Sequence, residues 1–160
     1  MKLTGYAVLW NEKAIEINGY TEVFRPYAFS QSIAQSNVYA LEEHKQHKIA
    51  KQSDGTLTLV EDETGLRYEM TISERDISKY KGVSVRFNPT AHSQQGNVHE
   101  VLTAQLIEIS LVSNPCYDCT TITIALDEKA LYAPVYSHFD VSKYNGDNPL
   151  CDSLPILKQT

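Results

Sequence analysis

A serine, several histidines and one carboxylate in this chain are of the types that carry nucleophilic catalysis. Ser84 stands in the segment KGVSVRF, two residues after Gly82 and at the start of a predicted strand. A serine hydroxyl becomes a nucleophile when a base lies within hydrogen-bond reach and a third group orients that base. The bases nearest in the sequence are His44, His92 and His99. These residue types permit a serine hydrolase and do not by themselves require one.

Glu108 is the carboxylate that stands out, because it lies within the otherwise apolar stretch LTAQLIEISLV. A carboxylate in the middle of an apolar strand costs free energy unless it is exposed or paired. Either Glu108 faces solvent on a one-sided strand, or it completes a triad with Ser84 and His44. Such triads are recognised by geometry and not by their order in the chain, so residue types and spacing leave both hypotheses open.

Two further spacings suggest metal or redox chemistry only weakly. His44 and His47 lie in EEHKQHK, which is not the HExxH arrangement, and no third ligand is evident. We favour a solvated polar loop there over a metal-dependent hydrolase. Cys116 and Cys119 have C-x-x-C spacing without a second pair, so we expect reduced cysteines and not a zinc site. With Cys151 the count is three, which favours a reducing, intracellular compartment over a disulfide scaffold.

The composition is that of a globular domain and excludes several classes of protein. The 160 residues are 42% hydrophobic and 21% charged, with a formal net charge of −6. We therefore expect neither wholesale disorder nor nucleic-acid binding, since no Lys/Arg-rich run exists. The apolar runs are too short for a membrane span, and the first residues do not resemble a signal peptide.

Alternating apolar residues predict a mainly β (α+β) fold, a mostly antiparallel barrel or curved sheet with two or more short helices. We expect helices over residues 27–35 and 73–82, and a β-hairpin of residues 56–60 and 66–72. The other predicted strands are 3–10, 22–24, 37–41, 83–87, 98–102, 104–112 and 120–126, with Asn88-Pro89 ending one strand and residues 91–97 forming a loop. Residues 129–160 carry three prolines and little periodicity, so we expect one domain, 1–128, with a C-terminal extension.

Side chains alternate along a strand, so the last long strand has two distinct faces. Its apolar face should fill the core and its other face should turn toward the loops and the strand of Ser84. The expected core set is Ile107, Ile109 and Leu111, and the opposite set is Glu108, Ser110 and Val112.

The order of the segments resembles the prohead (capsid maturation) protease family of tailed phages, which is similar to the herpesvirus assemblin. The resemblance covers about residues 3 to 126. The segments that carry it are GYAVLW, EVFRPYAFSQS, VYALEEHKQHKIAK, GTLTLVEDETGL, KGVSVRF and LIEISLVSNPCYDCT. It implies an assemblin-like fold and a serine endopeptidase that needs no metal or cofactor.

The resemblance also implies roles for individual residues. His44 matches the family histidine and Ser84 matches the nucleophile. The herpesvirus relatives look as if they use a second histidine, on the later strand, as the third catalytic residue. The matching strand here carries Glu108, and His99 is the alternative. Backbone N–H groups at Val85 and Arg86, with the Arg86 side chain, are the candidates for oxyanion stabilisation.

The sequence departs from the family pattern at four positions. The family often has Gly where this chain has Tyr27, Asp where it has Lys45, Gly where it has Arg86 and Ala where it has Cys116. None of these changes removes a proposed catalytic group, although Arg86 alters the surroundings of the nucleophile.

As substrates, the resemblance implies the capsid scaffold or the scaffold-like segment of the major capsid protein, and the protease itself. It implies a homodimer or higher oligomer in the host cytoplasm, inside the assembling prohead, without nucleic-acid or membrane partners. The alternative from another class is a non-catalytic capsid-assembly module of the same fold.

Overall fold

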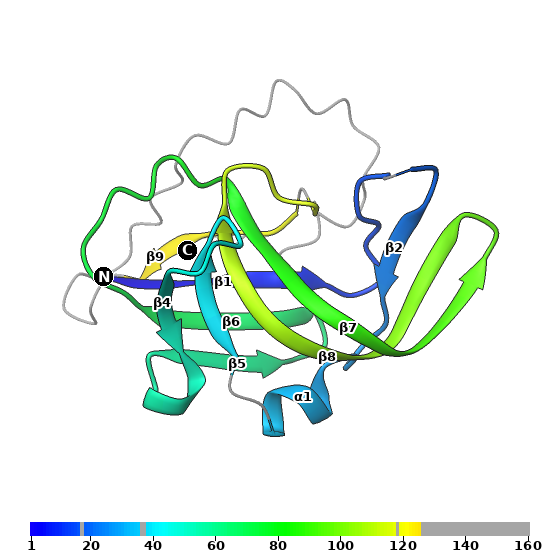
Figure 1. The fold of residues 1–160 in the computed structure, drawn as a ribbon, viewed down its shortest axis with the longest axis horizontal. Coiled ribbons are helices and arrows are strands. Elements are labelled where there is room, and N and C mark those ends of the chain that lie inside the picture. Colours follow the sequence, from blue (N-terminus) through cyan, green and yellow to red (C-terminus); the bar gives the residue numbers. More distant parts are fainter. Residues whose placement is uncertain (17, 36–37, 118, 126–160) are drawn as a thin grey trace, which may run out of the picture.

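The computed structural model of the protein describes residues 1–16, 18–35, 38–117 and 119–125. Within these ranges the chain forms strands, one α-helix and one 3-10 helix (Figure 1). Their bounds are β1 (Lys2–Leu9), β2 (Thr21–Phe24), α1 (Ser30–Gln35), β3 (Tyr39–Glu42), β4 (Lys48–Lys51), η1 (Gln52–Asp54), β5 (Leu57–Glu61), β6 (Gly65–Thr71), β7 (Gly82–Gln95), β8 (Val98–Val112) and β9 (Thr123–Ala125). The mainly β prediction is confirmed.

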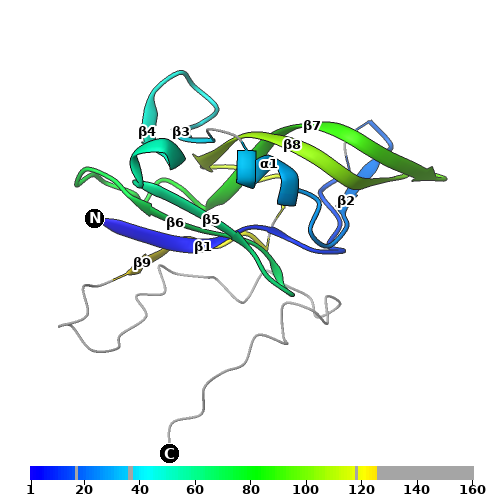
Figure 2. The same cartoon turned by 90° about the horizontal axis from the view of Figure 1, so that it is seen from below.

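The strands form two sheets that lie as two layers (Figure 2). The first sheet has the order β5-β6-β1-β9, and all its pairings are antiparallel. In the second sheet β8 is central: β7 pairs with it antiparallel, while β2 and β3 pair with it in parallel near its two ends. β4 extends this sheet by pairing with β3. The hairpin predicted for residues 56–60 and 66–72 is confirmed as β5–β6.

The core lies between the two layers. Alternate residues of β6, Leu66, Tyr68 and Met70, are at most 1% exposed, as expected for a strand with one face on the core. The rings of Phe24 and Phe87 meet edge to face, with centroids 4.7 Å apart. Burial of each such side chain contributes roughly 1.5–3 kcal/mol.

Of the two predicted arrangements, a barrel or a curved sheet, the barrel is not what the structure shows: the sheets are not closed on each other. At the start of β7 the segment before β9 approaches without forming a ladder. The Val83 N–H donates to the Thr120 side chain at 3.0 Å, and a Cβ on Gly82 would lie 2.4 Å from Thr120 Oγ1. At this position β7 is therefore held to the segment before β9 by a side-chain hydrogen bond and not by backbone pairing.

The helix predicted over residues 73–82 is also wrong, since the structure has no helix there. The Asp76 carboxylate accepts the Ser78 N–H at 2.9 Å, which offers the backbone a local partner in place of a helical one. Arg75 reaches away from the segment to Glu42, with Nη1 and Oε1 2.5 Å apart. These contacts hold the segment in an irregular path beside the end of β3.

The first predicted helix exists but is shorter than residues 27–35. Tyr27 has φ +62°, a left-handed conformation that a helix cannot include, and α1 begins at Ser30. The Glu61 carboxylate accepts the Phe29 N–H at 2.7 Å and the Ser30 hydroxyl at 2.5 Å. Negative charge at this position stabilises the start of a helix.

The strands β7 and β8 are longer than predicted. β7 includes the predicted strand 83–87 and most of the predicted loop 91–97, whose last residues form the turn to β8. The two predicted strands 98–102 and 104–112 are one continuous strand, β8. Asn88-Pro89 does not end β7, because β7 pairs only with β8 among the described residues and an edge strand tolerates proline. The sequence did not predict β4, since its residues follow a polar run.

The predicted extension, 129–160, lies outside the described residues. No helix in the described part of the chain is long and apolar enough to cross a membrane.

Candidate active site

The pairing of β7 with β8 brings together the two strands that carry Ser84 and Glu108. Ser84 pairs with Ser110, and Arg86 pairs with Glu108. Directly paired residues project to the same side of a sheet, so these four side chains share one face. Their neighbours in the strand, such as Ile109, point into the core. The shared face therefore points away from the first sheet.

A β-bulge shifts the register just before Glu108. Arg86 pairs with Glu108 but Phe87 pairs with Leu106, so Ile107 is an extra residue of β8. Ile107 is 38% exposed, and the prediction that it fills the core is wrong for this reason. The predicted core positions Ile109 and Leu111 are confirmed at 0% exposure.

The parallel pairing of β3 with β8 delivers His44 to the same face. β3 ends at Glu42, and Glu43 and His44 then have φ values of 49° and 54°. Left-handed conformations of non-glycine residues cost of order 1–3 kcal/mol each and persist where surrounding contacts enforce them. Here the Glu43 N–H donates to the Leu111 carbonyl at 2.9 Å, and the Glu43 carboxylate accepts the Ser113 N–H at 2.9 Å.

The ion pair between Glu42 and Arg75 fixes the start of this loop. Each side chain is 22% exposed. Burial raises the pKa of Glu42, but the hydrogen bond and the charge of Arg75 outweigh it and hold this pKa below its usual range. The segment that was predicted to be helical therefore contributes to the position of the histidine loop.

Glu108 is the centre of the hydrogen-bond network on this face. Its side chain is 3% exposed, and its Oε1 lies 2.5 Å from His44 Nδ1. Its Oε2 accepts the Ser110 hydroxyl at 2.6 Å, and Arg86 Nε lies 3.7 Å from Oε1. A buried carboxylate requires such partners. An ionised carboxylate only accepts hydrogen bonds, so Nδ1 of a neutral His44 carries the proton and Nε2 keeps its lone pair.

Ser110 is a member of this network that the sequence did not single out. It is 0% exposed, and its oxygen accepts the His44 N–H at 3.2 Å while its hydroxyl donates to Glu108. The signal that could have found it is its position two residues after Glu108, on the same face of the strand.

Ser84 lies beside this network and is 5% exposed. In the described part of the chain, His44 hydrogen-bonds to Ser110 and Glu108 but not to Ser84. In enzymes without substrate, catalytic hydrogen bonds are often long and tighten only when substrate binds. The arrangement can thus supply a hydroxyl, a base and a carboxylate that orients the base.

The two candidates for oxyanion stabilisation differ in placement. The Val83 N–H points away from β8, toward Thr120, and N–H groups alternate along a strand, so the Val85 N–H points to the same edge. The Arg86 N–H points toward β8 instead, and the Arg86 side chain lies against Glu108. The Val85 N–H is therefore the better placed donor next to Ser84.

The other candidate residues lie apart from this face. His99 pairs with Gln94 and stacks on Tyr20, with ring centroids 4.8 Å apart. Nine positions of β8 separate it from Glu108, a span of about 30 Å.

Apart from His44, the groups considered for metal or redox chemistry lie outside the network. His47 is exposed in the loop after His44, and Cys116 and Cys119 are partly buried in the segment after β8. Within residues 1–16, 18–35, 38–117 and 119–125, no three His, Cys, Asp or Glu side chains form a metal-binding group.

Comparison with known proteins agrees with the resemblance seen in the sequence. A family model described as caudovirus prohead serine protease matches residues 1–133. A search of curated proteins finds no significant match. The match spans most of the chain, including both strands and the loop that carry Ser84, His44 and Glu108. The chain therefore belongs to the family of caudovirus prohead serine proteases.

Proposed function

We propose that the chain is a serine endopeptidase that processes the capsid scaffold, or the scaffold-like segment of the major capsid protein, and also cleaves itself. Family membership supplies the general function, a serine protease of capsid maturation. The observation that carries the specific proposal is the 2.5 Å contact of His44 Nδ1 with Glu108 Oε1, on the face that holds Ser84. On this proposal residues 1–128 are the protease domain, and the protein acts in the host cytoplasm inside the assembling prohead.

The proposed reaction uses three side chains and one backbone group. Ser84 Oγ attacks the scissile carbonyl while His44 Nε2 takes the hydroxyl proton and then gives it to the leaving amine. Glu108 holds the imidazole in this tautomer and stabilises the imidazolium. The Val85 N–H donates to the oxyanion; such a donor is worth about 2.7–4 kcal/mol in the transition state. Water then takes the place of the departed amine: His44 Nε2 takes its proton as its oxygen bonds to the acyl carbon, and returns this proton to Ser84 Oγ as the ester bond breaks.

Glu108→Gln is expected to lower the cleavage rate by up to about 10⁴-fold, because an amide can stabilise the wrong imidazole tautomer and cannot stabilise the imidazolium. His99→Gln should change the rate by less than about tenfold, or about 1.4 kcal/mol, because His99 lies at the other end of β8. The measurement is co-expression with the phage's major capsid and scaffold proteins, followed by mass spectrometry of the products. The opposite ranking of the two variants would make His99 the third member.

Ser110→Ala is expected to lower kcat by about 10²-fold with little change in KM, because it releases both Glu108 and the His44 backbone. The free energy of unfolding should fall by about 1–3 kcal/mol, since two buried groups lose a partner. Ser113→Ala is the matched control: Ser113 is exposed and contributes only its N–H to Glu43. A loss of stability with unchanged kcat would show a purely structural role for Ser110.

A further inference from the structure

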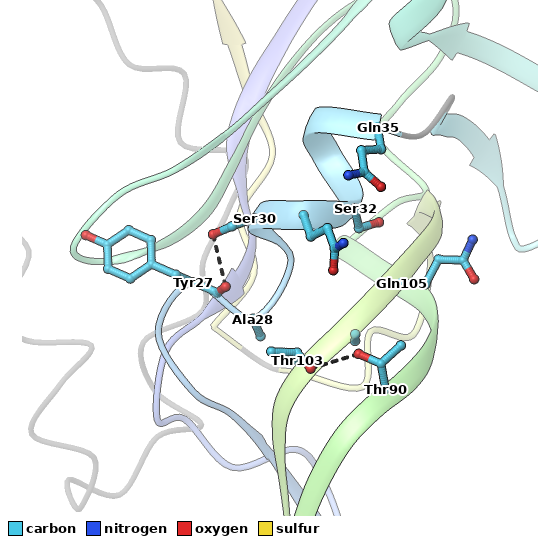
Figure 3. A pocket seen from close by; sticks show the side chains of 10 residues that line it. Tyr27, Ala28, Ser30, Ser32, Gln35, Thr90, Thr103 and Gln105 are labelled. Carbon is cyan, nitrogen blue, oxygen red and sulfur yellow. Dashed lines mark hydrogen bonds between the residues drawn. The ribbon is translucent and has the colours of Figure 1, made fainter.

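A pocket of about 530 Å³ lies between α1 and the β7–β8 hairpin (Figure 3). The helix side contributes polar side chains such as Ser30, Gln31 and Gln35, and the hairpin side contributes Thr90, Thr103 and Gln105. None of the residues that line the pocket is charged. The proposed reaction uses none of them.

The wall between helix and hairpin is fixed by buried hydrogen bonds. The Leu106 N–H donates to the Ser32 hydroxyl at 2.6 Å, and the Ala104 N–H donates to the Ala28 carbonyl at 2.8 Å. These contacts fill the part of the β8 edge that neither β2 nor β3 pairs. The pocket is therefore formed before any ligand binds, which lowers the entropic cost of binding.

Part of the pocket lining lies on the same face of the sheet as Ser84. Along β7 the residues Ser84, Arg86 and Asn88 alternate with core-facing ones, and Asn88 pairs with Gln105 of the pocket. Thr90 and Thr103 follow, with their hydroxyls 2.8 Å apart. Six positions separate Ser84 from Thr90, which corresponds to about 20 Å of extended chain. An extended polypeptide cleaved at Ser84 can therefore reach the pocket with a residue about six positions from the scissile bond.

The lining determines which side chains suit this position. Amides and hydroxyls both donate and accept hydrogen bonds, so they satisfy a partner of the same kind. A charged side chain would lose water there without gaining an opposite charge. We infer that the pocket is a substrate subsite for an uncharged, hydrogen-bonding side chain (Gln, Asn, Ser or Thr) about six residues from the scissile bond. This inference rests on the proposed function and adds a substrate class to it.

The test is to change the substrate side chain that is preferred about six residues from the scissile bond by placing a carboxylate in the pocket lining. The full-length chain and its Gln105→Glu variant are incubated with a positional-scanning library of 16-residue synthetic peptides, and the products are identified by mass spectrometry. The wild type should prefer uncharged polar residues about six positions from the cut. The variant should gain about fivefold in kcat/KM for Lys or Arg at that position, as expected for one exposed ion pair. Gln31→Glu, on the helix side, should act in the same direction.

Gln95→Glu is the control, because Gln95 is exposed at the far end of β7 and does not line the pocket. It should leave the preference unchanged. Efficient cleavage with no preference at that distance, or with a preference that neither pocket variant alters, overturns the subsite and leaves the protease intact. A change of oligomeric state in Gln105→Glu with unaltered preference would place a second copy of the chain there and also overturns it. No cleavage of any library peptide, together with no fluorophosphonate labelling of Ser84, overturns both the subsite and the proposed function.

Discussion

Ser84→Ala is expected to lower the rate of capsid-protein cleavage by about 10⁶-fold, the loss typical of a serine protease without its nucleophile. The side chain lies on the outer face of β7, opposite Ser110, which belongs to the network that holds His44. The free energy of unfolding should change by less than about 1 kcal/mol, because the hydroxyl has no hydrogen bond within the described chain that the fold would lose. Product masses after co-expression and thermal unfolding of the purified variant measure the two effects separately.

The control for this variant is Ser73→Ala, an exposed serine in the segment that precedes β7. Wild type and Ser73→Ala should both react with a fluorophosphonate probe at Ser84, and Ser84→Ala should not. Cleavage that persists in Ser84→Ala would remove the serine mechanism. Absence of labelling in the wild type would favour the non-catalytic assembly module.

Part of this site could be predicted because it depends on the alternation of side chains. Ile109 and Leu111 face the core, so the residues between and beside them, Ser110 and Glu108, must face away from it. The bulge at Ile107 could not be predicted in the same way. It depends on the register between two strands, and local periodicity contains no information on that register.

The position of His44 depends even more on contacts between distant residues. The left-handed backbone at Glu43 and His44 is unfavourable locally and is held by Leu111, Ser110 and Ser113, which lie far along the chain. Similarly, residues 73–82 have a pattern compatible with a helix, but the turn at Asp76 and the Arg75–Glu42 ion pair hold them in an irregular conformation. Local propensity is a weak determinant when such tertiary contacts compete with it.

His44→Ala is expected to match the loss of Ser84→Ala, about 10⁶-fold, because the base and the nucleophile act as one unit. The double variant of Ser84 and His44 should be no slower than either single variant. Stability should fall modestly, since Glu108 loses one of its partners while Ser110 and Arg86 remain. A double variant whose losses add would indicate that the two residues serve different steps.

His47→Ala separates this mechanism from a metal site built on the two loop histidines. His47 is exposed, and His44 Nδ1 is already engaged by Glu108, so only Nε2 of His44 is available to any further partner. In the described chain these histidines belong to no cluster of three metal-binding side chains. We therefore expect His47→Ala to change the rate by less than about threefold, or about 0.6 kcal/mol, and chelators to leave it unaltered. Equal losses of cleavage rate in the His44 and His47 variants that added zinc restores would instead indicate that His44 Nε2 binds a metal ion. Nε2 would then be unable to take the proton of Ser84.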